Sequence, residues 1–495
     1  MSADEPGVET RVARGIAWSA GAQAIIAVAD LVSQLLVVAL WISPEDFGIA
    51  FAAIPFYTAL DYIADLGVSS ALIQHDDHTP ESVSTVFWFN VIISTALFVI
   101  LLGVGPLYGF ILDKPIVGWL LAGYGVKLLL QNVYAIPFAF LRKELRYSEI
   151  AKARIVAHLS ESAARILFAM AGVTVWCWTF AALTRALIFG VIMQARHPFV
   201  PRWVFRPKKV MHLVKFGART AASNVLYQVY TSMDSPIIFH FFGETANGIY
   251  GLADSIVLEP VKTIANVVVD VAFPTFSRLR SDRRGLVSQF IKLTRLNLLA
   301  VLPFTVIILL VIPEILNLFY LGSKWGPSDL DWCADAARIL CVMGFFRAMG
   351  FLGPPLLDGV GRPDLTLRYM FIATFAVPGS FLIGALTLGG RMNFLSVAVA
   401  WAIGYPIAFA VLAYLVIHTV KLPVREYLRA SWGIIASCAI GCGVGFVVDF
   451  LLVPDAGDLL RLMAIAGSAL VTMGLLLVYW QKLTPRGISA SLKSK

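Results

Sequence analysis

The sequence predicts an all-α polytopic membrane protein with about fourteen transmembrane helices. Of its 495 residues, 59% are hydrophobic and only 14% are charged, whereas soluble domains are about 45–50% apolar and about 25% charged. Apolar runs recur along the whole chain, and the basic residues gather in alternate connections between them. A soluble chain of this length would need several domains with polar surfaces, and there are too few charges to cover them.

The apolar runs have the length of membrane-spanning helices, which need about 20 residues. They are too long and too uniformly apolar for the alternating strands of a transmembrane barrel. The run after the acidic N-terminus is also too long for a cleaved signal peptide, so it predicts an uncleaved first helix. The predicted helices cover residues 15–41, 46–68, 83–105, 115–140, 148–171, 173–195, 213–241, 246–272, 290–320, 334–357, 365–389, 394–418, 430–450 and 459–480.

The charge of the connections predicts the orientation. Counting from the N-terminus, 28 basic residues lie on one set of connections and termini, and four lie on the opposite set. Cytoplasmic loops carry the excess of Lys and Arg in such proteins. We therefore expect a multi-pass membrane protein with both termini in the cytoplasm. The net charge of +8 is then mainly a topology signal with a generic attraction to anionic lipids, and no nucleic-acid partner is expected.

The five cysteines indicate no metal or disulfide framework. Their number is odd and none forms a CxxC pair. Cys438 and Cys442 stand four apart within an apolar run, where packing is the expected role.

Short segments repeat at an offset of about 200 positions, which predicts two halves of six helices. Pro44–Ile49 precedes the second predicted helix, and Glu244–Tyr250 precedes the eighth. Transporters are often built from such repeats. The predicted organisation is an N-terminal lobe at 1–195, a basic linker at 196–212, a C-terminal lobe at 213–418, and two extra helices with a basic tail at 419–495.

A family resemblance rests on four segments in order: DFGIAF from Asp46, DLGVSSALIQ from Asp65, AFLRKELRY from Ala139 and LNLFYLGSKW from Leu316. Across about residues 10–420 the chain resembles the polysaccharide transporters, or Wzx-type lipid-linked oligosaccharide flippases, of the multidrug/oligosaccharidyl-lipid/polysaccharide superfamily. No single segment is specific, and their order carries the resemblance. It implies two lobes around a central cavity, alternating access, and transfer of an undecaprenyl-diphosphate-linked sugar unit between leaflets.

Ionisable residues inside the predicted helices mark the expected position of a polar cavity, because such groups are costly in lipid and tend to face the interior of the bundle. They lie within the first ten helices, whereas the last four are nearly free of charge. The cavity is therefore expected along helices 1, 2, 7 and 8, with helices 4, 5, 6 and 10 contributing and the last two helices facing lipid. The cations are Lys127, Arg165, Arg185, Arg219, Lys262, Arg338 and Arg347, and the acids are Asp30, Asp61, Asp65, Glu161, Asp234, Asp254, Glu259 and Asp270.

A diphosphate or acidic sugar needs cationic partners, and arginine offers a bidentate fork. The substrate-binding candidates are Arg185, Arg347, Lys127, Lys262 and Arg219. The competing interpretation is pairing within the protein. Glu161 and Arg165 stand four apart and Glu259 and Lys262 three apart, which is the spacing of helical ion pairs.

The acids suggest ion coupling, and two prolines suggest hinges. Asp61 and Asp65 are like charges on one helical face, an arrangement that favours a bound proton or cation, and Asp30 is the third candidate. The sequence does not decide whether these acids couple transport to Na⁺ or H⁺ or are merely solvated; no other cofactor and no metal are expected.

Two prolines within the predicted helices indicate possible hinges. Pro236 and Pro260 are the hinge candidates, with static kinks as the alternative.

The resulting hypothesis is a flippase for a lipid-linked oligosaccharide, and therefore a protein that is not an enzyme. A GxxxxGK[ST] motif is absent, so ATP is not the direct driver. One alternative is a cation-coupled multidrug exporter of the same superfamily, which the excess of intramembrane cations disfavours. The other is a membrane-embedded polysaccharide polymerase or glycosyltransferase, for which the predicted loops are too short. The sequence does not decide the sugar repeat or whether polymerase machinery binds.

Overall fold

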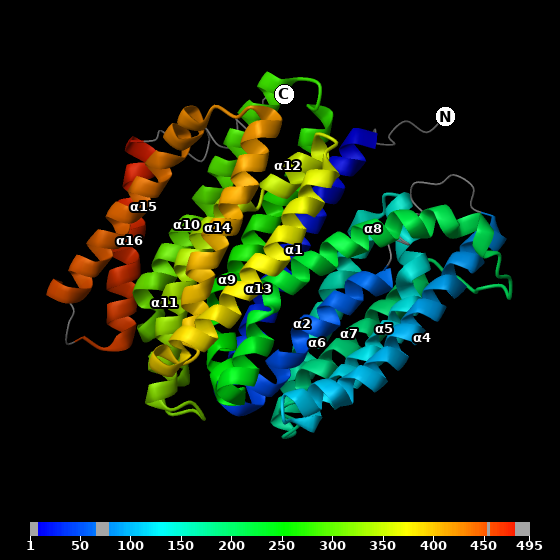
Figure 1. Ribbon diagram of the computed structural model, residues 1–495, viewed down its shortest axis with the longest axis horizontal. Coiled ribbons are helices and arrows are strands. Elements are labelled where there is room, and N and C mark those ends of the chain that lie inside the picture. The colour runs from blue at the N-terminus through cyan, green and yellow to red at the C-terminus, as the bar shows by residue number, and fades with distance from the viewer. Residues whose placement is uncertain (1–7, 66–78, 453–455, 481–495) are drawn as a thin grey trace. The chain divides into compact units, whose positions relative to one another are not determined.

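The computed structural model describes residues 8–65, 79–452 and 456–480, and within these ranges all regular secondary structure is helical. This confirms the predicted all-α class (Figure 1). The part of the DLGVSSALIQ segment after Asp65 lies outside the described residues. The helices are α1 Val8–Leu40, α2 Pro44–Asp65, α4 Pro80–Ile111, α5 Pro115–Lys143, α6 Tyr147–Met170, α7 Cys177–Arg196, α8 Pro207–Ser232, α9 Asp234–Arg278, α10 Arg283–Tyr320, α11 Pro327–Gly350, α12 Gly353–Gly359, α13 Pro363–Met392, α14 Leu395–Val420, α15 Val424–Leu452 and α16 Asp458–Tyr479.

Within the described residues, each predicted apolar stretch falls mainly on helical structure. Among the described residues, ten helices are long and apolar enough to cross a membrane. The stretch 334–357 covers most of α11 and most of α12, and the stretch 213–241 covers most of α8 and the first turns of α9. The number of membrane crossings stays a prediction.

The sequence predicts one helix at 213–241 and another at 246–272, but the structure interrupts this region at two other points. The first is a break at Met233, between α8 and α9. Pro236 follows in the first turn of α9; it has no amide hydrogen to donate to Ser232, and its ring crowds that carbonyl. The second is Gly243, whose φ of 87° and ψ of 177° interrupt α9. Such a conformation favours glycine because a Cβ would be strained, so the chain turns here before Glu244.

The chain forms two compact units, unit 1 at 1–248 and unit 2 at 249–495. The boundary differs from the predicted linker at 196–212, because α8 packs against α2 and α4. The two units are defined by compact packing, whereas the predicted lobes are defined by a sequence repeat. The packing therefore does not test the lobe boundaries, which stay a prediction.

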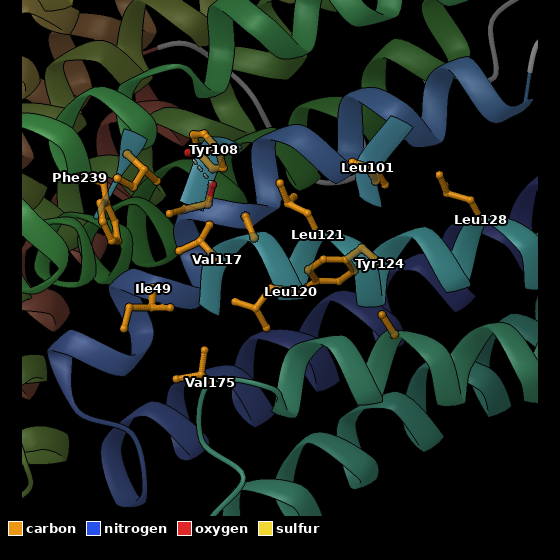
Figure 2. Close-up of a cluster of buried hydrophobic side chains, with 14 of the residues drawn as sticks. Ile49, Leu101, Tyr108, Val117, Leu120, Leu121, Tyr124, Leu128, Val175 and Phe239 are labelled. Carbon is orange, nitrogen blue, oxygen red and sulfur yellow. Dashed lines mark hydrogen bonds between the residues drawn. The ribbon is translucent and has the colours of Figure 1, made fainter. Parts of the chain in front are cut away.

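Unit 1 is a bundle in which α4 packs on α5, α5 on α7, α7 on α6 and α6 on α1. Its apolar core joins α2, α4 and α5 through side chains such as Ile49, Leu120 and Leu121 (Figure 2). Tyr108 of α4 donates a hydrogen bond of 3.3 Å from its hydroxyl to the carbonyl of Ala52 on α2. The buried phenol is therefore satisfied, and it ties the two helices together.

Unit 2 is organised around α10, which packs on α11, α15 and α16. Arg461 at the start of α16 pairs with Glu314 of α10 at 3.2 Å and with Asp449 of α15 at 2.5 Å. Elsewhere α15 and α16 expose large apolar side chains, including Phe450 and Val471. The two helices are thus attached to α10 along one side, as expected of helices that otherwise face lipid.

The start of α2 crosses the α9 segment after Gly243 with direct backbone contact. A Cβ added at Gly48 would lie 1.8 Å from the carbonyl oxygen of Glu244, and one added at Gly248 would lie 1.8 Å from that of Pro44. Asn247 donates a 2.8 Å hydrogen bond from its amide to the carbonyl of Gly48. Only glycine at both positions permits this approach, which joins the two segments that the sequence identified as repeats.

Lys114 forms ion pairs with an acid on each of the two crossing segments. Lys114 lies 2.8 Å from Glu244 and 3.5 Å from Glu45. The hydrogen bond to Glu244 raises the pKa of Lys114 above its usual value. Burial is the largest single influence and pushes the pKa of Glu244 up, but the hydrogen bond from Lys114, a backbone hydrogen bond and the positive charge of Lys114 together outweigh it and leave that pKa lowered. Both groups are charged at neutral pH; the pair is lost as pH falls through the lowered pKa of Glu244 or rises through the raised pKa of Lys114.

We expect Gly48→Ala to destabilise the protein, because the new methyl group overlaps the backbone oxygen of Glu244 and the two helices must separate. A cost of about 1–3 kcal/mol follows for overpacking of this kind. The melting temperature of the purified protein measures it. Gly103→Ala on α4 is the matched control, because a Cβ there meets nothing within 4 Å. Equal melting temperatures for the two variants would contradict the backbone contact.

Candidate functional site

Ionisable side chains from five helices of unit 1 gather into one cluster. We call it the unit 1 charge network, and it consists of Asp30 on α1, Asp61 on α2, Lys127 on α5, His158, Glu161 and Arg165 on α6, and Arg185 on α7.

Lys127 and Asp61 form the α2–α5 side of the network. The ammonium of Lys127 donates to one carboxylate oxygen of Asp61, and Gln131 donates to the other at 2.8 Å. The ammonium also lies 5.0 Å from the ring centre of Tyr57, which stacks on Tyr124 at 3.9 Å. Lys127 is almost fully buried, and its charge is stabilised by a carboxylate and an aromatic face together.

Glu161 is the centre of the α6–α7 side. One carboxylate oxygen accepts a 3.1 Å hydrogen bond from Arg185 on α7. The other lies 3.9 Å from Arg165, one turn further along α6. The side chains of Glu161 and Arg165 are 9% and 8% exposed, whereas that of Arg185 is 29% exposed. Arg185 is therefore the member of this group that a solute can reach.

Asp30 brings α1 into the network. Its carboxylate lies 3.0 Å from Nδ1 of His158 and accepts a 3.2 Å hydrogen bond from Ser162. His158 lies between two acids, because Glu161 is 3.5 Å from the same ring nitrogen. Arg165 donates to the backbone carbonyl of Asp30 at 3.3 Å. The α1–α6 contact is thus made by polar groups as well as by packing.

The two sides interact with each other, since Arg185 lies within electrostatic reach of Asp61 and Tyr57. Three basic side chains, Lys127, Arg165 and Arg185, face the three carboxylates of Asp30, Asp61 and Glu161. The network is therefore balanced in charge when the imidazole is neutral. Balance of this kind is required where water is scarce, because an unpaired charge in apolar surroundings is very unfavourable.

Unit 2 carries a smaller group on α9 and α11. Lys262 lies 3.3 Å from Glu259 of the same helix, which confirms the ion pair expected from their spacing. Arg347 on α11 is 6% exposed, lies 5.6 Å from the Phe351 ring centre, and is within electrostatic reach of Glu259. Pro260 lies within α9 beside this group. The predicted cations Lys262 and Arg347 thus share an acidic neighbour.

The structure places most of the predicted residues in these two groups. Arg219 and Asp65 lie on α8 and α2, but their side chains are outside the described residues. The binding candidate Lys127 and the coupling candidate Asp61 contact each other directly. Arg185 has its partner on a neighbouring helix, which no same-helix spacing could predict.

Sequence reasoning missed His158, Ser162 and Gln131. His158, Glu161, Ser162 and Arg165 stand at positions i, i+3, i+4 and i+7 of α6. That spacing places them on one face of a helix, and the resulting polar stripe is the signal that identifies them. Gln131 follows Lys127 by four residues and lies on the same face of α5.

The arrangement supports two kinds of ligand chemistry. The guanidinium of Arg185 presents its N–H donors in a planar fork. A phosphate or carboxylate ligand can accept hydrogen bonds from this fork in competition with Glu161. A small cation or proton can be held where Asp30, His158 and Glu161 converge, since one donor atom from each lies within 4.8 Å of the others.

The polysaccharide biosynthesis protein family matches residues 37–329, which is more than half of the chain. The chain belongs to this family. The matched region of this polysaccharide biosynthesis protein holds all of the unit 1 charge network except Asp30.

Named relatives agree with that assignment. The chain is 24% identical over 437 residues to the lipopolysaccharide biosynthesis protein WzxC of Escherichia coli (strain K12), covering 84% of this chain and 83% of the relative. It is 24% identical over 351 residues to the succinoglycan biosynthesis transport protein ExoT of Rhizobium meliloti (strain 1021), covering 70% and 69%.

Solved structures show the fold. The lipid II flippase MurJ in an inward closed conformation aligns with a TM-score of 0.72 at 17% identity, covering 93% of this chain and 99% of MurJ. An inward-facing multidrug-resistance transporter of the MATE family aligns with a TM-score of 0.63 at 17% identity, covering 81% and 95%. This polysaccharide biosynthesis protein thus has the fold of the superfamily that its sequence resembles.

We expect Glu161→Gln to destabilise the protein by about 3–5 kcal/mol, because it leaves the buried Arg165 without its carboxylate and frees Arg185. The measurement is the melting temperature in detergent. Asp364→Asn is the matched control, since its pair with Arg362 is exposed and exposed pairs contribute about 0–1 kcal/mol. A Glu161→Gln protein as stable as the control would show that Glu161 is not the centre of the network.

Proposed function

We propose that this protein flips an undecaprenyl-diphosphate-linked oligosaccharide repeat unit across the bacterial inner membrane, for exopolysaccharide or lipopolysaccharide synthesis, by alternating access. The observation that carries the proposal is the unit 1 charge network, in which the partly exposed guanidinium of Arg185 is held by a single acid. A polar network inside helices that are otherwise apolar is expected where a polar solute crosses a membrane.

The relatives support this function. WzxC is named for lipopolysaccharide biosynthesis and ExoT for succinoglycan transport. MurJ, which shares the fold, is named as a lipid II flippase. We infer that this chain, like MurJ, acts on a lipid-linked saccharide, and that its product serves a polymerising machinery with which it associates.

The chemistry proposed is exchange of ionic partners. The diphosphate enters as an anion and accepts hydrogen bonds from Arg185, which releases Glu161 toward Arg165 and His158. Lys127 keeps its aromatic and carboxylate neighbours and adds positive charge beside the path. Lys262 and Arg347 of unit 2 offer the same chemistry to an anion. Because each cation returns to its own acid when the substrate leaves, binding can be reversible.

The orientation proposed places both termini and the basic connections in the cytoplasm, as the positive-inside rule requires. It puts the Gly48–Gly248 crossing on the opposite side of the membrane from the basic connections. An enzymatic function is not favoured: among the described connections, the one between α7 and α8 covers only 197–206, too short for a catalytic domain.

Deletion of the gene is expected to accumulate the lipid-linked repeat unit on the cytoplasmic face of the membrane. The measurement is accessibility of the labelled saccharide to a membrane-impermeant reagent in sealed vesicles of both orientations. A protein that instead exports organic cations would leave that distribution unchanged and confer drug resistance. Shortened polymers with normal flipping would indicate a polymerase.

We expect Arg185→Ala and Arg347→Ala each to lower the flipping rate by about tenfold or more, because a hydrogen bond to a charged group contributes about 1.5–3 kcal/mol. The assay is polymer export in a complemented deletion strain at equal protein levels. Arg338→Ala is the matched control on α11, since that side chain is 46% exposed and pairs with Asp335. Normal export with both Arg185 and Arg347 removed would exclude these residues as the substrate site.

We further propose that Asp30, with His158 and Glu161, holds the coupling Na⁺ or H⁺. Asp61 pairs directly with Lys127, whereas the carboxylate of Asp30 contacts an imidazole and a hydroxyl, and Arg165 contacts only its backbone carbonyl. Asp30→Asn should abolish acceleration of transport by an imposed Na⁺ or pH gradient in proteoliposomes. Asp335→Asn is the control, because its pair with Arg338 is exposed. Unchanged acceleration in Asp30→Asn would reject this assignment.

A further inference from the structure

Unit 2 has an apolar groove of about 160 Å³ that the transport proposal does not use. Its walls come from α10, the end of α11, α12, α14 and the start of α15, and they are almost entirely hydrocarbon. The groove is open on one side. Its lining includes Phe290, Met349, Phe409, Ala413, Val416 and Leu428.

The groove lies where three helix ends are fastened together near the basic connections. Phe290 of α10 stacks on Tyr427 of α15 at 5.9 Å. Arg283 at the start of α10 donates to the backbone carbonyls of Val420 and Lys421 at 3.0 and 3.1 Å, and so caps the end of α14. The groove is therefore bounded by a rigid framework at its charged end.

Two arginines lie on the first turns of α15, each next in sequence to a residue that lines the groove. Arg425 and Arg429 are one helical turn apart, which puts their side chains on one face about 5–6 Å from each other at Cβ. Both are exposed, and among the described residues neither forms an ion pair. On the helix surface they lie next to the groove residues Val424 and Leu428, while Glu426 points to the side away from Val424.

An exposed aromatic side chain indicates the depth of Arg425 and Arg429 in the membrane. Trp432 is 64% exposed and follows Arg425 by seven residues, so it lies on the same face of α15. Exposed tryptophans of membrane proteins sit at the headgroup level. The arginines are thus at the depth of lipid phosphates, and the groove extends from there into the hydrocarbon.

We propose that this groove is a binding site for an anionic phospholipid. One acyl chain lies in the groove against Phe409, Ala413 and Val416, and the phosphate is held between Arg425 and Arg429. Charge complementarity favours an anionic headgroup over a zwitterionic one, since basic pockets between membrane helices select such lipids. Within the bilayer the acyl chain gains van der Waals packing against the groove walls, since lipid tails are already in apolar surroundings.

The bound lipid would bridge α10, α14 and α15, and it would hold the turn between α14 and α15 to the rest of unit 2. This is independent of the transported substrate, because the groove contains none of the charged groups assigned to transport.

Native mass spectrometry of the full-length protein, with phosphatidylglycerol or phosphatidylethanolamine added at defined concentrations, tests the proposal. The wild type is expected to retain phosphatidylglycerol in preference. The variant Arg425→Gln/Arg429→Gln should bind phosphatidylglycerol about thirtyfold more weakly, with phosphatidylethanolamine unchanged. Ala413→Phe, which fills the groove, should weaken retention of both lipids; Ala413→Leu replaces it if the larger side chain lowers the melting temperature.

Arg280→Gln/Arg368→Gln is the matched control, since both arginines are exposed in unit 2 and, unlike Arg425 and Arg429, neither is next in sequence to a residue that lines the groove. It should retain phosphatidylglycerol like the wild type. Equal retention of the two lipids by the wild type would overturn the proposal. Normal binding of phosphatidylglycerol by the Arg425→Gln/Arg429→Gln variant would also overturn it. Displacement of phosphatidylglycerol by equimolar undecaprenyl phosphate would assign the groove to the substrate's lipid instead.

Discussion

The need to pair every buried charge governs the architecture of unit 1. Glu161 lies among apolar helices and contacts Arg165 on its own helix, Arg185 on α7 and, through His158, Asp30 on α1. Each contact is satisfied only at one rotation and one height of the helices involved. Apolar packing tolerates small sliding and rotation, whereas a carboxylate that loses its guanidinium in low dielectric does not. The ionic contacts therefore set the register, and the apolar core fills the space that this register leaves.

Such networks are not the most stable solution to packing. Well-packed hydrophobic residues often replace buried ion pairs without loss of stability. The retention of six charges and a histidine at the junction of five helices is better explained by use than by stability. An ion-paired side chain can exchange its partner for a charged ligand during transport, whereas an aliphatic side chain cannot.

The sequence carried enough information for the helices and for most of the charged positions, but not for the pairing. Apolar run length is a local property, and so is the spacing that places Glu259 against Lys262. The partner of Arg185 depends on how α6 and α7 are rotated against each other, and the partner of Asp61 lies 66 residues away on α5. Glu314 was overlooked because it lies in a strongly apolar run, and only the packing of α16 on α10 shows that Arg461 accompanies it. The break at Met233 was similarly concealed, since the apolar pattern continues through Pro236.

The crossing of Gly48 and Gly248 has the form of an isologous contact. Gly48 faces the carbonyl four residues before Gly248, and Gly248 faces the carbonyl four residues before Gly48, at the same distance. Subunits of a two-fold dimer meet in this way, each residue making the same contact from either side. Here both copies belong to one chain, so a single substitution places a new side chain on one arm of the contact only. A homodimer would suffer both losses from a single mutation, whereas this chain can acquire different side chains around its two glycines one at a time. The fused arrangement thus permits a symmetric contact to become asymmetric gradually, as a protein needs when the two sides of its path come to bind different parts of one substrate.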